Sequence, residues 1–316
     1  MHPLLAAHAA TAVPDDVRGY WDGGAGRTAA AASAAWEAVR LRPRVLRDVS
    51  TVDTALELLG SRLSTPVLVG PTALHGLAHP DGEVATARGT AAAGSLLVLS
   101  TRSSRALEEV PAGPWWIQAY VMRDRGRTRA LVQRAAAAGA TAVVLTGDTP
   151  YLGRRAVRRA PLPPEQEQDP SAGPEMITEL AQASGLPVLV KGVLRGDDAV
   201  ACLDAGASGI VVSNHGGRQL DRAVATAVAL PEVVDAVAGR GPVLVDGGLR
   251  SGLDVLCALA LGADGVLLGR PVLWALAADG AAGVQACLEA LTQDLAHAMG
   301  LAGARHLAAL TRDLVV

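Results

Sequence analysis

The stretch GIVVSNHGGRQLD, residues 209–221, indicates both the fold class of this chain and the place of its site. Its first four residues, Gly209 to Val212, form an apolar, β-branched run that predicts a buried parallel strand. A histidine, two glycines and an arginine follow at the carboxyl end of that strand, with His215 and Arg218 as the functional side chains. In a barrel of alternating strands and helices, this end carries the chemistry.

Short apolar runs of this kind recur eight times along the chain, mostly separated by alanine-rich stretches of helical periodicity. They span residues 66–70, 95–100, 115–120, 141–146, 187–191, 209–213, 242–246 and 265–269. Strict alternation of strand and helix predicts a parallel sheet, and eight units predict closure into a (β/α)8 TIM barrel. An open doubly wound sheet is the alternative, but it does not need eight units. We expect one domain, with residues 1–60 as an N-terminal helical extension covering the barrel and residues 61–316 as the barrel.

The helical stretches include residues 127–138, 196–205 and 252–261. A glycine stands between such a helix and the next strand at Gly139, Gly206 and Gly262. Glycine suits a left-handed helix cap at this point, which supports the placing of the helix ends.

The composition argues against several classes of partner. The chain has 316 residues, is 50% hydrophobic and carries a net charge of −3, so it offers no electrostatic footprint for nucleic acid or an acidic membrane. No uninterrupted apolar run approaches the ~20 residues of a membrane span, and the first residues lack the basic region of a signal peptide. Three widely spaced cysteines without a CxxC pair favour buried thiols in a reducing cytoplasm. We therefore expect a cytoplasmic protein without a membrane, nucleic-acid or metal partner.

Nearly every predicted strand ends in a polar group, and the carboxyl ends of the strands converge on one mouth of the barrel. Lys191 is the only lysine among the 28 basic residues, which favours a role for a compact ammonium at a place where a guanidinium does not fit. The polar groups at the other ends are Thr72, Ser100, Arg102, Gln118, Tyr120, Thr146, Asp148, Ser213, Asn214, His215, Arg218, Asp246, Arg250 and Arg270.

Two groups of these residues suggest different tasks. Asp246-Gly247-Gly248 with Arg250, and Gly269-Arg270, follow the seventh and eighth strands, where barrels commonly bind phosphate through backbone N–H groups. The second group is a histidine with carboxylate and arginine neighbours. A histidine beside a carboxylate is an oriented general base, and two arginines can clamp a substrate carboxylate. This group consists of His215, Asp148, Arg155, Arg218, Tyr20 and Tyr120.

Five motifs, taken together and in order, resemble the FMN-dependent α-hydroxy acid oxidase/dehydrogenase family, whose members oxidise glycolate, lactate and mandelate or hydroxymandelate. They are SNHGGRQLD (213–221), LVKG (189–192), LTGDTPYLGRR (145–155), VDGGLRSG (245–252) and LGRPVLWALA (268–277). The resemblance extends from about Tyr20 to about Gly303, nearly the whole chain, and agrees with the predicted barrel.

The resemblance implies FMN as cofactor and a role for each site residue. His215 is implied as the base that removes the substrate hydroxyl proton, and Asp148 as the group that orients it. Lys191 is implied beside the N1/O2 edge of the flavin, where a fixed cation stabilises the anionic reduced ring. The residues implied to bind substrate are Tyr20, Tyr120, Arg155 and Arg218. Those implied to bind FMN are Pro71, Thr72, Ala73, Ser100, Gln118, Thr146, Ser213, Asp246, Gly247, Gly248, Arg250, Gly269 and Arg270.

The implied reaction is the oxidation of an (S)-2-hydroxy acid to a 2-oxo acid, with a bulky or aromatic, mandelate-like substrate as one option. The α-hydrogen passes to flavin N5, formally as hydride, and a carbanion route uses the same residues. Reoxidation by O2 gives H2O2, whereas a quinone or protein acceptor makes the enzyme a dehydrogenase. The family also implies a homo-oligomer, expected to be a tetramer. An FMN barrel of another class, such as a flavin-dependent isomerase, and a non-catalytic flavin-binding protein are the alternatives.

Two departures from the family pattern bear on the substrate. The family often has an aromatic residue where this chain has Arg102, which either points to solvent or reads a second polar or anionic group of the substrate. The segment AVRRAPLPPEQEQDPSAG (156–173) follows the fourth strand and is rich in proline and charge, which predicts a surface loop over the active face. It is shorter and more polar than its counterpart in the family. We therefore expect an open site that tolerates bulky substrates.

Overall fold

The computed structural model describes residues 13–22, 26–110, 113–151 and 163–316. Arg155 and the first part of the polar segment after the fourth strand lie outside these ranges, so the predictions made for them have no structural counterpart here.

Eight parallel strands close into a barrel in the order β10-β3-β4-β5-β6-β7-β8-β9. The predicted TIM barrel is confirmed, and each of its strands falls within or overlaps one of the eight predicted runs. The strands are β3 (Val67–Val69), β4 (Leu97–Leu99), β5 (Trp115–Ala119), β6 (Val143–Thr146), β7 (Val188–Val193), β8 (Gly209–Val212), β9 (Val243–Asp246) and β10 (Gly265–Leu268).

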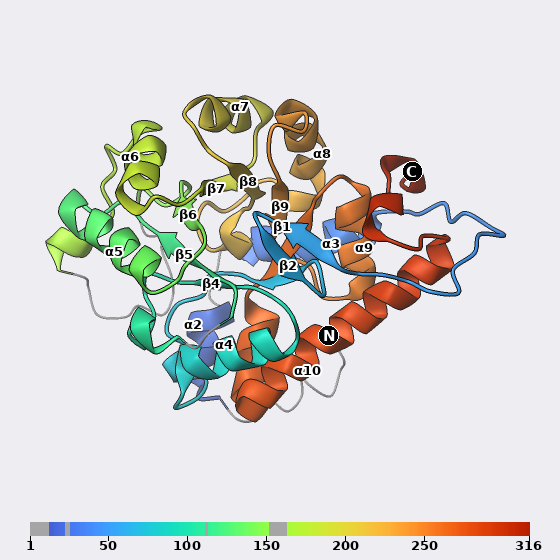
Figure 1. The fold of residues 1–316 in the computed structure, drawn as a ribbon, viewed down its shortest axis with the longest axis horizontal. Helices are drawn as coiled ribbons and strands as arrows, with labels where there is room; N and C mark the ends of the chain where they lie inside the picture. The colour runs from blue at the N-terminus through green and yellow to red at the C-terminus, as the bar shows by residue number, and fades with distance from the viewer. Residues whose placement is uncertain (1–12, 23–25, 111–112, 152–162) are drawn as a thin grey trace.

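Helices surround the barrel as an outer ring (Figure 1). They are α4 (Gly82–Ala92), α5 (Arg125–Ala137), α6 (Glu175–Ser184), α7 (Gly196–Asp204), α8 (Thr226–Val237), α9 (Gly252–Ala260) and α10 (Arg270–Ala302). Short 3-10 turns lie at η1 (His75–Leu77), η2 (Leu107–Glu109), η3 (Pro164–Gln166), η4 (His215–Gly217), η5 (Leu307–Ala309) and η6 (Arg312–Leu314). The three glycines placed before strands adopt the expected left-handed backbone, with φ of 94° at Gly139, 97° at Gly206 and 105° at Gly262.

Strand residues alternate between the inside and the outside of the barrel, as the pleat requires. The inward positions form one apolar cluster, with Trp116 as its largest side chain and Leu68, Val98, Val144, Leu189, Val211, Leu244 and Leu267 from the other seven strands. The residues on either side of these positions, such as Val143 and Leu145, belong to a second cluster between the strands and the helices. The barrel is therefore a packed core and not a pore.

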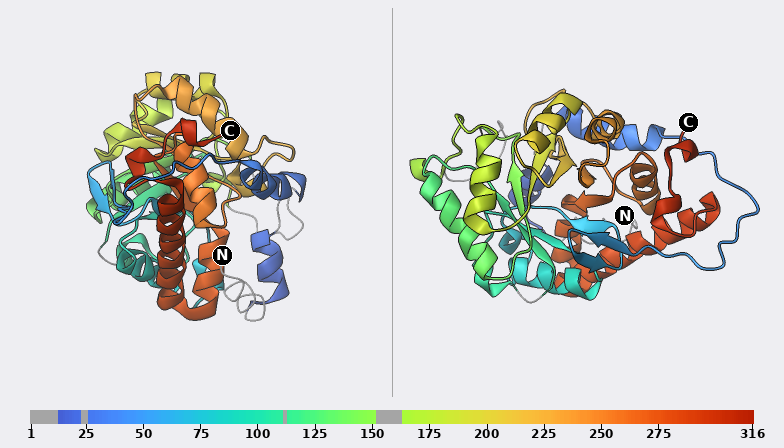
Figure 2. Two further views of the ribbon diagram at one scale, coloured as in Figure 1. Left: turned by 90° about the vertical axis from the view of Figure 1, so that its right-hand side faces the viewer. Right: turned by 45° about the horizontal axis from the view of Figure 1, so that its top comes forward.

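The N-terminal segment contacts both ends of the barrel. An antiparallel hairpin of β1 (Leu56–Leu58) and β2 (Ser61–Leu63) places Leu58 and Leu63 in the inner apolar cluster. The proposed boundary at residue 60 falls in the turn of this hairpin, where Leu59 and Gly60 have φ of 44° and 78°. Helices α2 (Asp15–Asp22) and α3 (Gly26–Ala38) lie on the side of the molecule away from the hairpin (Figures 1 and 2).

Helix α10 is the longest element of the described chain, and an 18-residue window of it, with a mean hydropathy of 1.3, is apolar enough to cross a membrane by length and composition. It is not one regular helix, because Asp279 and Gly280 leave the helical backbone with φ of −155° and 51°. Of that apolar window, 56% is buried, and the helix packs against α4 and α9. Packing inside the protein thus accounts for the apolar sequence.

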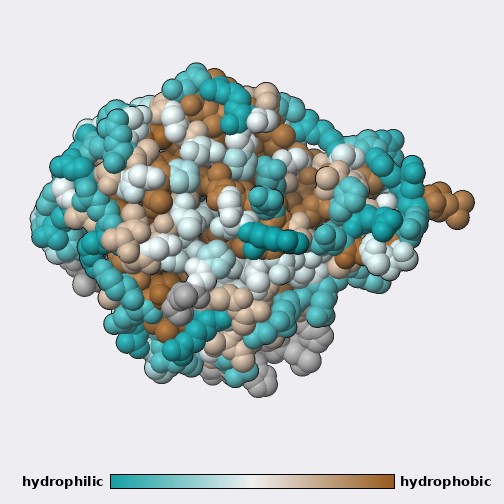
Figure 3. Space-filling model, in the orientation of Figure 1, coloured by the Kyte–Doolittle hydropathy of each residue, from teal (hydrophilic) through white to brown (hydrophobic). Residues whose placement is uncertain are grey.

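The loop between α3 and β1 projects from the body of the molecule (Figure 1), and Figure 3 shows an apolar tip on the same side. Val45 and Leu46 in this loop are 78% and 102% exposed. Two adjacent aliphatic side chains with this much exposed surface are typical of a surface that another molecule covers.

Replacing Leu63 by alanine tests the hairpin as a plug of the barrel. The side chain is 2% exposed, so its truncation leaves a cavity and should lower the free energy of unfolding by about 2–5 kcal/mol. Denaturant unfolding measures the change, with the exposed neighbour variant Arg62→Ala as control, expected within about 0.5 kcal/mol of wild type. Equal stability of Leu63→Ala and wild type would show that the hairpin does not close the barrel.

Candidate active site

A polar layer lies directly above the apolar interior of the barrel. Each strand contributes the residue two positions beyond its inward apolar side chain, so the alternation of the pleat turns that residue toward the same axis. The eight residues are Gly70, Ser100, Gln118, Thr146, Lys191, Ser213, Asp246 and Gly269. Seven of these, all but Gly70, were predicted from sequence as cofactor-binding residues, and the barrel brings all eight to one end.

Gln118 connects the polar groups of three neighbouring strands. Its carbonyl oxygen accepts hydrogen bonds from the Ser100 hydroxyl at 3.4 Å and from the Thr101 N–H at 3.1 Å. Its amide nitrogen donates to the Thr146 hydroxyl at 3.0 Å. Gln118 is 1% exposed, so these bonds fix the amide and hold the strand ends β4, β5 and β6 in one arrangement.

Lys191 lies on the other half of this layer with its ammonium buried. Its Nζ donates to the Ser213 hydroxyl at 2.9 Å and forms an ion pair with Asp246 Oδ2 at 3.0 Å. Burial alone lowers the pKa of Lys191, but the charges of Asp246 and Asp148 outweigh it and raise that pKa above its usual value. The ammonium is therefore a fixed positive charge at the floor of the site.

His215 and Asp148, predicted as base and orienting group, lie in contact. His215 Nδ1 is 3.0 Å and 3.1 Å from the two carboxylate oxygens of Asp148. Both side chains are mostly buried, with 18% and 16% exposed. Burial acts to raise the pKa of Asp148, but the hydrogen bond and charge of His215 and the charge of Lys191 lower it, so the carboxylate stays ionised.

The close approach of Asp148 depends on a glycine in β7. This strand continues past the predicted end at Lys191 to Val193, and its register against β8 shifts between those two residues. Gly192, at this irregularity, has φ of 110°, and a Cβ there would lie 2.5 Å from Asp148 Cβ. A β-bulge with a glycine thus leaves room for the carboxylate that orients the histidine.

His215 has a left-handed backbone with φ of 57°, which non-glycine residues rarely adopt. Its N–H donates to the Ser213 hydroxyl at 3.0 Å, so the hydroxyl that accepts from Lys191 also holds the histidine backbone. Strain of this kind persists where the surroundings over-determine it and is concentrated at functional sites.

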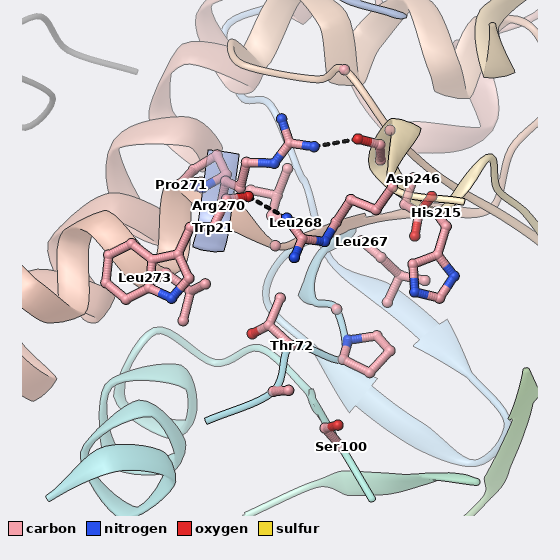
Figure 4. Close-up of a pocket in the computed structure, with 18 of the residues that line it drawn as sticks. Trp21, Thr72, Ser100, His215, Asp246, Leu267, Leu268, Arg270, Pro271 and Leu273 are labelled. Carbon is pink, nitrogen blue, oxygen red and sulfur yellow. Dashed lines mark hydrogen bonds between the residues drawn. The ribbon is translucent and has the colours of Figure 1, made fainter. Parts of the chain in front are cut away.

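These groups border a cavity at the carboxyl end of the barrel, whose empty space is about 1120 Å³ when the part open to solvent is included. In Figure 4, His215 and Asp246 lie on one side of it and Trp21 and Leu273 on the other. The predicted residues that line it are Tyr20, Pro71, Thr72, Ala73, Ser100, Arg102, Tyr120, Lys191, His215, Arg218, Asp246, Gly247, Gly248, Arg250, Gly269 and Arg270. Gln118, Thr146, Ser213 and Asp148 do not line it and act through their hydrogen bonds to residues around it.

The N-terminal helix α2 is fastened to the site through Arg218. The Arg218 guanidinium donates to the backbone oxygens of Tyr20, at 2.7 Å, and of Trp21. It also lies over the Tyr20 ring, 5.4 Å from the ring centre. Two residues predicted to bind substrate therefore meet at the mouth of the cavity, although 198 positions separate them in sequence.

The segment after β9 offers a backbone cradle. A Cβ at Gly248 would lie 2.6 Å from backbone atoms of Ala32 in α3, and the Trp36 indole donates to the Gly247 oxygen at 2.8 Å. Arg250 and Arg270 line the same part of the cavity, and Arg270 donates to the Gly216 oxygen. Close backbone approach beside two guanidiniums, at the start of α10, is the chemistry of a phosphate site.

The residues present fit FMN. Asp246 Oδ1 is buried and has no hydrogen-bond partner among the described residues, although Oδ2 of the same carboxylate pairs with Lys191. A buried orphan acceptor of this kind calls for a ligand hydroxyl, and the ribityl chain of FMN carries several. Asp246 would hold the ribityl chain, the Gly248–Arg250–Arg270 end would hold the phosphate, and Lys191 would lie by the ring, with Gln118 holding Ser100 in place behind the cavity wall.

Sequence reasoning missed a buried network behind Thr72. The Thr72 hydroxyl is 2.5 Å from His75 Nε2, and His75 Nδ1 is 2.8 Å from the Thr86 hydroxyl. Glu83, which is fully buried, accepts the His75 N–H at 2.9 Å and the Ser104 N–H at 2.9 Å. Burial lowers the pKa of His75, so the ring is neutral. Its hydrogen bond to the Thr72 hydroxyl holds that side chain in place at the cavity wall. The sequence showed only a histidine and a glutamate, His75 and Glu83, close after Thr72. This pattern is too common in turns to predict a buried network.

Barrel and site together define a class: oxidoreductases that bind a flavin nucleotide at the carboxyl end of a TIM barrel. A family model described as FMN-dependent dehydrogenase matches residues 9–171 and 164–316. The chain belongs to the FMN-dependent dehydrogenase family.

Relatives support the same assignment. The chain is 44% identical to the L-lactate oxidase of Nostoc sp. (strain PCC 7120 / SAG 25.82 / UTEX 2576), with 87% of this chain and 86% of the relative covered. It is 40% identical to 2-hydroxyacid oxidase 1 of Homo sapiens over 347 aligned positions, with 98% and 94% covered. This alignment is longer than the 316 residues of the chain, so the chain carries deletions relative to the human protein.

Solved structures of mandelate oxidase match over nearly the whole chain. One, with (S)-mandelic acid, has a TM-score of 0.93 and 42% identity and covers 99% of this chain and 96% of that one. Another, with (S)-4-hydroxymandelic acid, has a TM-score of 0.93 and 40% identity, with 99% and 97% covered. The predictions of FMN as cofactor and of an FMN-dependent oxidoreductase of the 2-hydroxy acid oxidase class are confirmed, and a flavin-dependent isomerase is set aside.

A Glu83→Gln variant tests the buried network. Burial acts to raise the pKa of Glu83, but the hydrogen bonds that it accepts from Ser104 and from the His75 N–H lower it below its ordinary value of 4.5. The carboxylate therefore stabilises the folded state above that pH, and this contribution is lost as pH falls through the folded-state pKa. We expect Glu83→Gln to lose about 1–3 kcal/mol of unfolding free energy at pH 7 and less below pH ~4. Urea unfolding at several pH values measures this, and a pH-independent difference would contradict it.

Proposed function

We propose that this chain oxidises an (S)-2-hydroxy acid to the 2-oxo acid, with His215 as the base. The observation that carries the proposal is the His215–Asp148 pair, set at the mouth of a cavity whose floor holds the Lys191 ammonium. The relatives named as lactate and 2-hydroxyacid oxidases support this reaction class.

Asp148 decides which nitrogen of His215 serves as the base. The carboxylate accepts a hydrogen bond from Nδ1–H and so holds the proton on Nδ1, which leaves Nε2 as the basic nitrogen that accepts the proton of the substrate hydroxyl. Since Asp148 stays ionised, it stabilises the imidazolium formed when that proton arrives. Asp148 thus lowers the barrier without touching the substrate.

Arg218 and Tyr20 supply the carboxylate end of the substrate site. The contact of Arg218 with the backbone of α2 places its charge at the cavity wall, beside the Tyr20 ring. A guanidinium there pairs with the substrate carboxylate and directs the hydroxyl-bearing carbon toward His215. The predicted second arginine, Arg155, lies outside the described residues, and its part in the clamp stays a prediction.

When bound, FMN would supply the two-electron acceptor: it would take the α-hydrogen as a hydride or, in the carbanion route, the electron pair left after the α-hydrogen has departed as a proton. Lys191 prepares the site for the negative charge that accompanies this transfer, because its ammonium is in place before the reaction and does not reorganise. Asp246 and Ser213 keep that ammonium protonated and oriented.

The substrate side of the cavity has room for a bulky or aromatic substituent. Tyr20, Trp21, Tyr120 and Leu273 line it, and they offer apolar and aromatic surface. The matched mandelate oxidase structures, with mandelic and 4-hydroxymandelic acids, support an aromatic 2-hydroxy acid. Dioxygen is the proposed acceptor, with H2O2 as product, and peroxide detection during turnover tests this.

A His215→Gln variant tests the base. It should bind FMN like wild type but be reduced by (S)-mandelate at least about 100-fold more slowly, because the proton acceptor is lost. Anaerobic stopped-flow bleaching of the flavin band measures the rate. The control is Leu220→Ala, at a leucine that is 76% exposed and outside the cavity lining, expected to bleach normally. Bleaching of His215→Gln at the wild-type rate would remove the histidine from the mechanism.

We also propose that the protein is a cytoplasmic homo-oligomer, a tetramer. All three cysteines are free, and burial raises the pKa of the Cys257 and Cys287 thiols to about 11, which suits unreactive thiols in a reducing compartment. The exposed pair Val45 and Leu46 supports contact with a second copy of the chain.

Light scattering of Leu46→Ser tests the oligomer. Replacing this fully exposed leucine by a polar side chain should weaken the contact and lower the mean mass at low micromolar concentration, since burying a hydroxyl is unfavourable. Val228→Ser in helix α8 is the control, at an aliphatic side chain that is 64% exposed. A monomeric wild type would contradict the proposal.

A further inference from the structure

Arg102 is held firmly at the edge of the active site. Its N–H donates to the Ser100 hydroxyl at 3.1 Å, and its carbonyl oxygen accepts the Leu74 N–H at 3.0 Å. Its guanidinium lies over the Tyr120 ring, 5.2 Å from the ring centre. The side chain is half-buried and lines the same cavity as His215 and Lys191.

The Arg102 guanidinium has no hydrogen-bond or carboxylate partner among the described residues and lies over the Tyr120 ring. The other arginines of the cavity differ in this respect. Arg218, Arg250 and Arg270 each donate to a backbone oxygen. A half-buried cation that gives up part of its hydration without a partner is costly, and an anionic ligand would remove that cost.

A second hollow continues from the active site past Arg102 and Tyr120, which line both. Met122, Ala130 and Leu131 give its wall apolar surface. Its two other arginines are already paired: Arg134 with Glu108 at 2.8 Å, and Arg127 with Asp124 at 3.4 Å. Within the described lining, Arg102 is thus the cation left for a ligand that reaches out of the active site.

We propose that Arg102 binds a second, distal carboxylate of the substrate, so that this chain prefers 2-hydroxy acids whose side chain carries a negative charge. The inference rests on the proposed function, because it extends the substrate of the same site. The planar guanidinium can bind a carboxylate through two parallel N–H bonds, and its place over the Tyr120 ring keeps it at the cavity wall. A neutral group of the same shape gains only part of this interaction.

Two isosteric substrates separate charge from shape: (S)-4-carboxymandelate and (S)-4-nitromandelate. Wild type should show a kcat/KM about 10- to 100-fold higher for the carboxylate, the range of a charged hydrogen-bonded pair. Arg102→Gln should bring the two values within about 3-fold of each other, and Arg102→Lys should keep part of the preference. Because the ratio is compared, any effect of the substitution on Tyr120 acts on both substrates and cancels.

Arg134→Gln is the matched control, since this residue lines the second hollow but not the active site and is bound by Glu108. It should keep the wild-type ratio. A binding measurement without turnover uses 4-carboxyphenylacetate and 4-nitrophenylacetate, which lack the hydroxyl and are followed by the shift of the flavin spectrum. Arg102→Gln should weaken binding of the first compound alone.

A wild type that treats both substrates equally, or an Arg102→Gln variant that keeps the preference, would overturn the role of Arg102. Oxidation of unsubstituted (S)-mandelate by the same preparations would then show that the proposed function stands. If no 2-hydroxy acid reduces the flavin of wild type, the proposed function itself fails, and this inference fails with it.

Discussion

The alternation of side chains along eight short strands is the constraint on which the site depends. In a closed parallel barrel every second residue faces the axis. Two successive inward-facing residues of one strand therefore lie in different places, the first in the packed interior and the second at the open mouth. In β7 these residues are Leu189 and Lys191, and in β9 they are Leu244 and Asp246. The apolar layer beneath excludes water from the ammonium and the carboxylate, which strengthens their interaction and gives both a fixed place.

Buried charges in this layer are tolerated because each charged group has an oppositely charged or hydrogen-bonding partner. Lys191 binds Asp246 and Ser213, Ser213 holds the backbone of His215, and His215 binds Asp148, whose carboxylate lowers the energy of Lys191 in turn. These groups stabilise one another only as a complete network, because removal of one member leaves a buried group without its partner. Orientation of the base and charge of the floor are therefore parts of one network, and a change at either end affects the other.

The sequence was sufficient to predict the barrel and most of the floor of the site, because both follow from short-range periodicity. Ser100, Gln118 and Thr146 end apolar runs, and strand ends converge whatever the helices between them do. What could not be predicted depends on pairs far apart in sequence. The bulge at Gly192, the plug formed by Leu63 and the attachment of Arg218 to α2 leave no periodic pattern, since each arises only when the barrel has closed.

The cavity itself carries more positive than negative charge, and this excess explains why the fold suits an anionic cofactor and an anionic substrate together. Arg250 and Arg270 lie at the cradle end of the cavity, and Arg218 lies beside α2. Each donates to a backbone oxygen, which fixes its direction but does not neutralise its charge. Bound phosphate and carboxylate would balance this positive charge, so binding of cofactor and substrate should stabilise the folded chain.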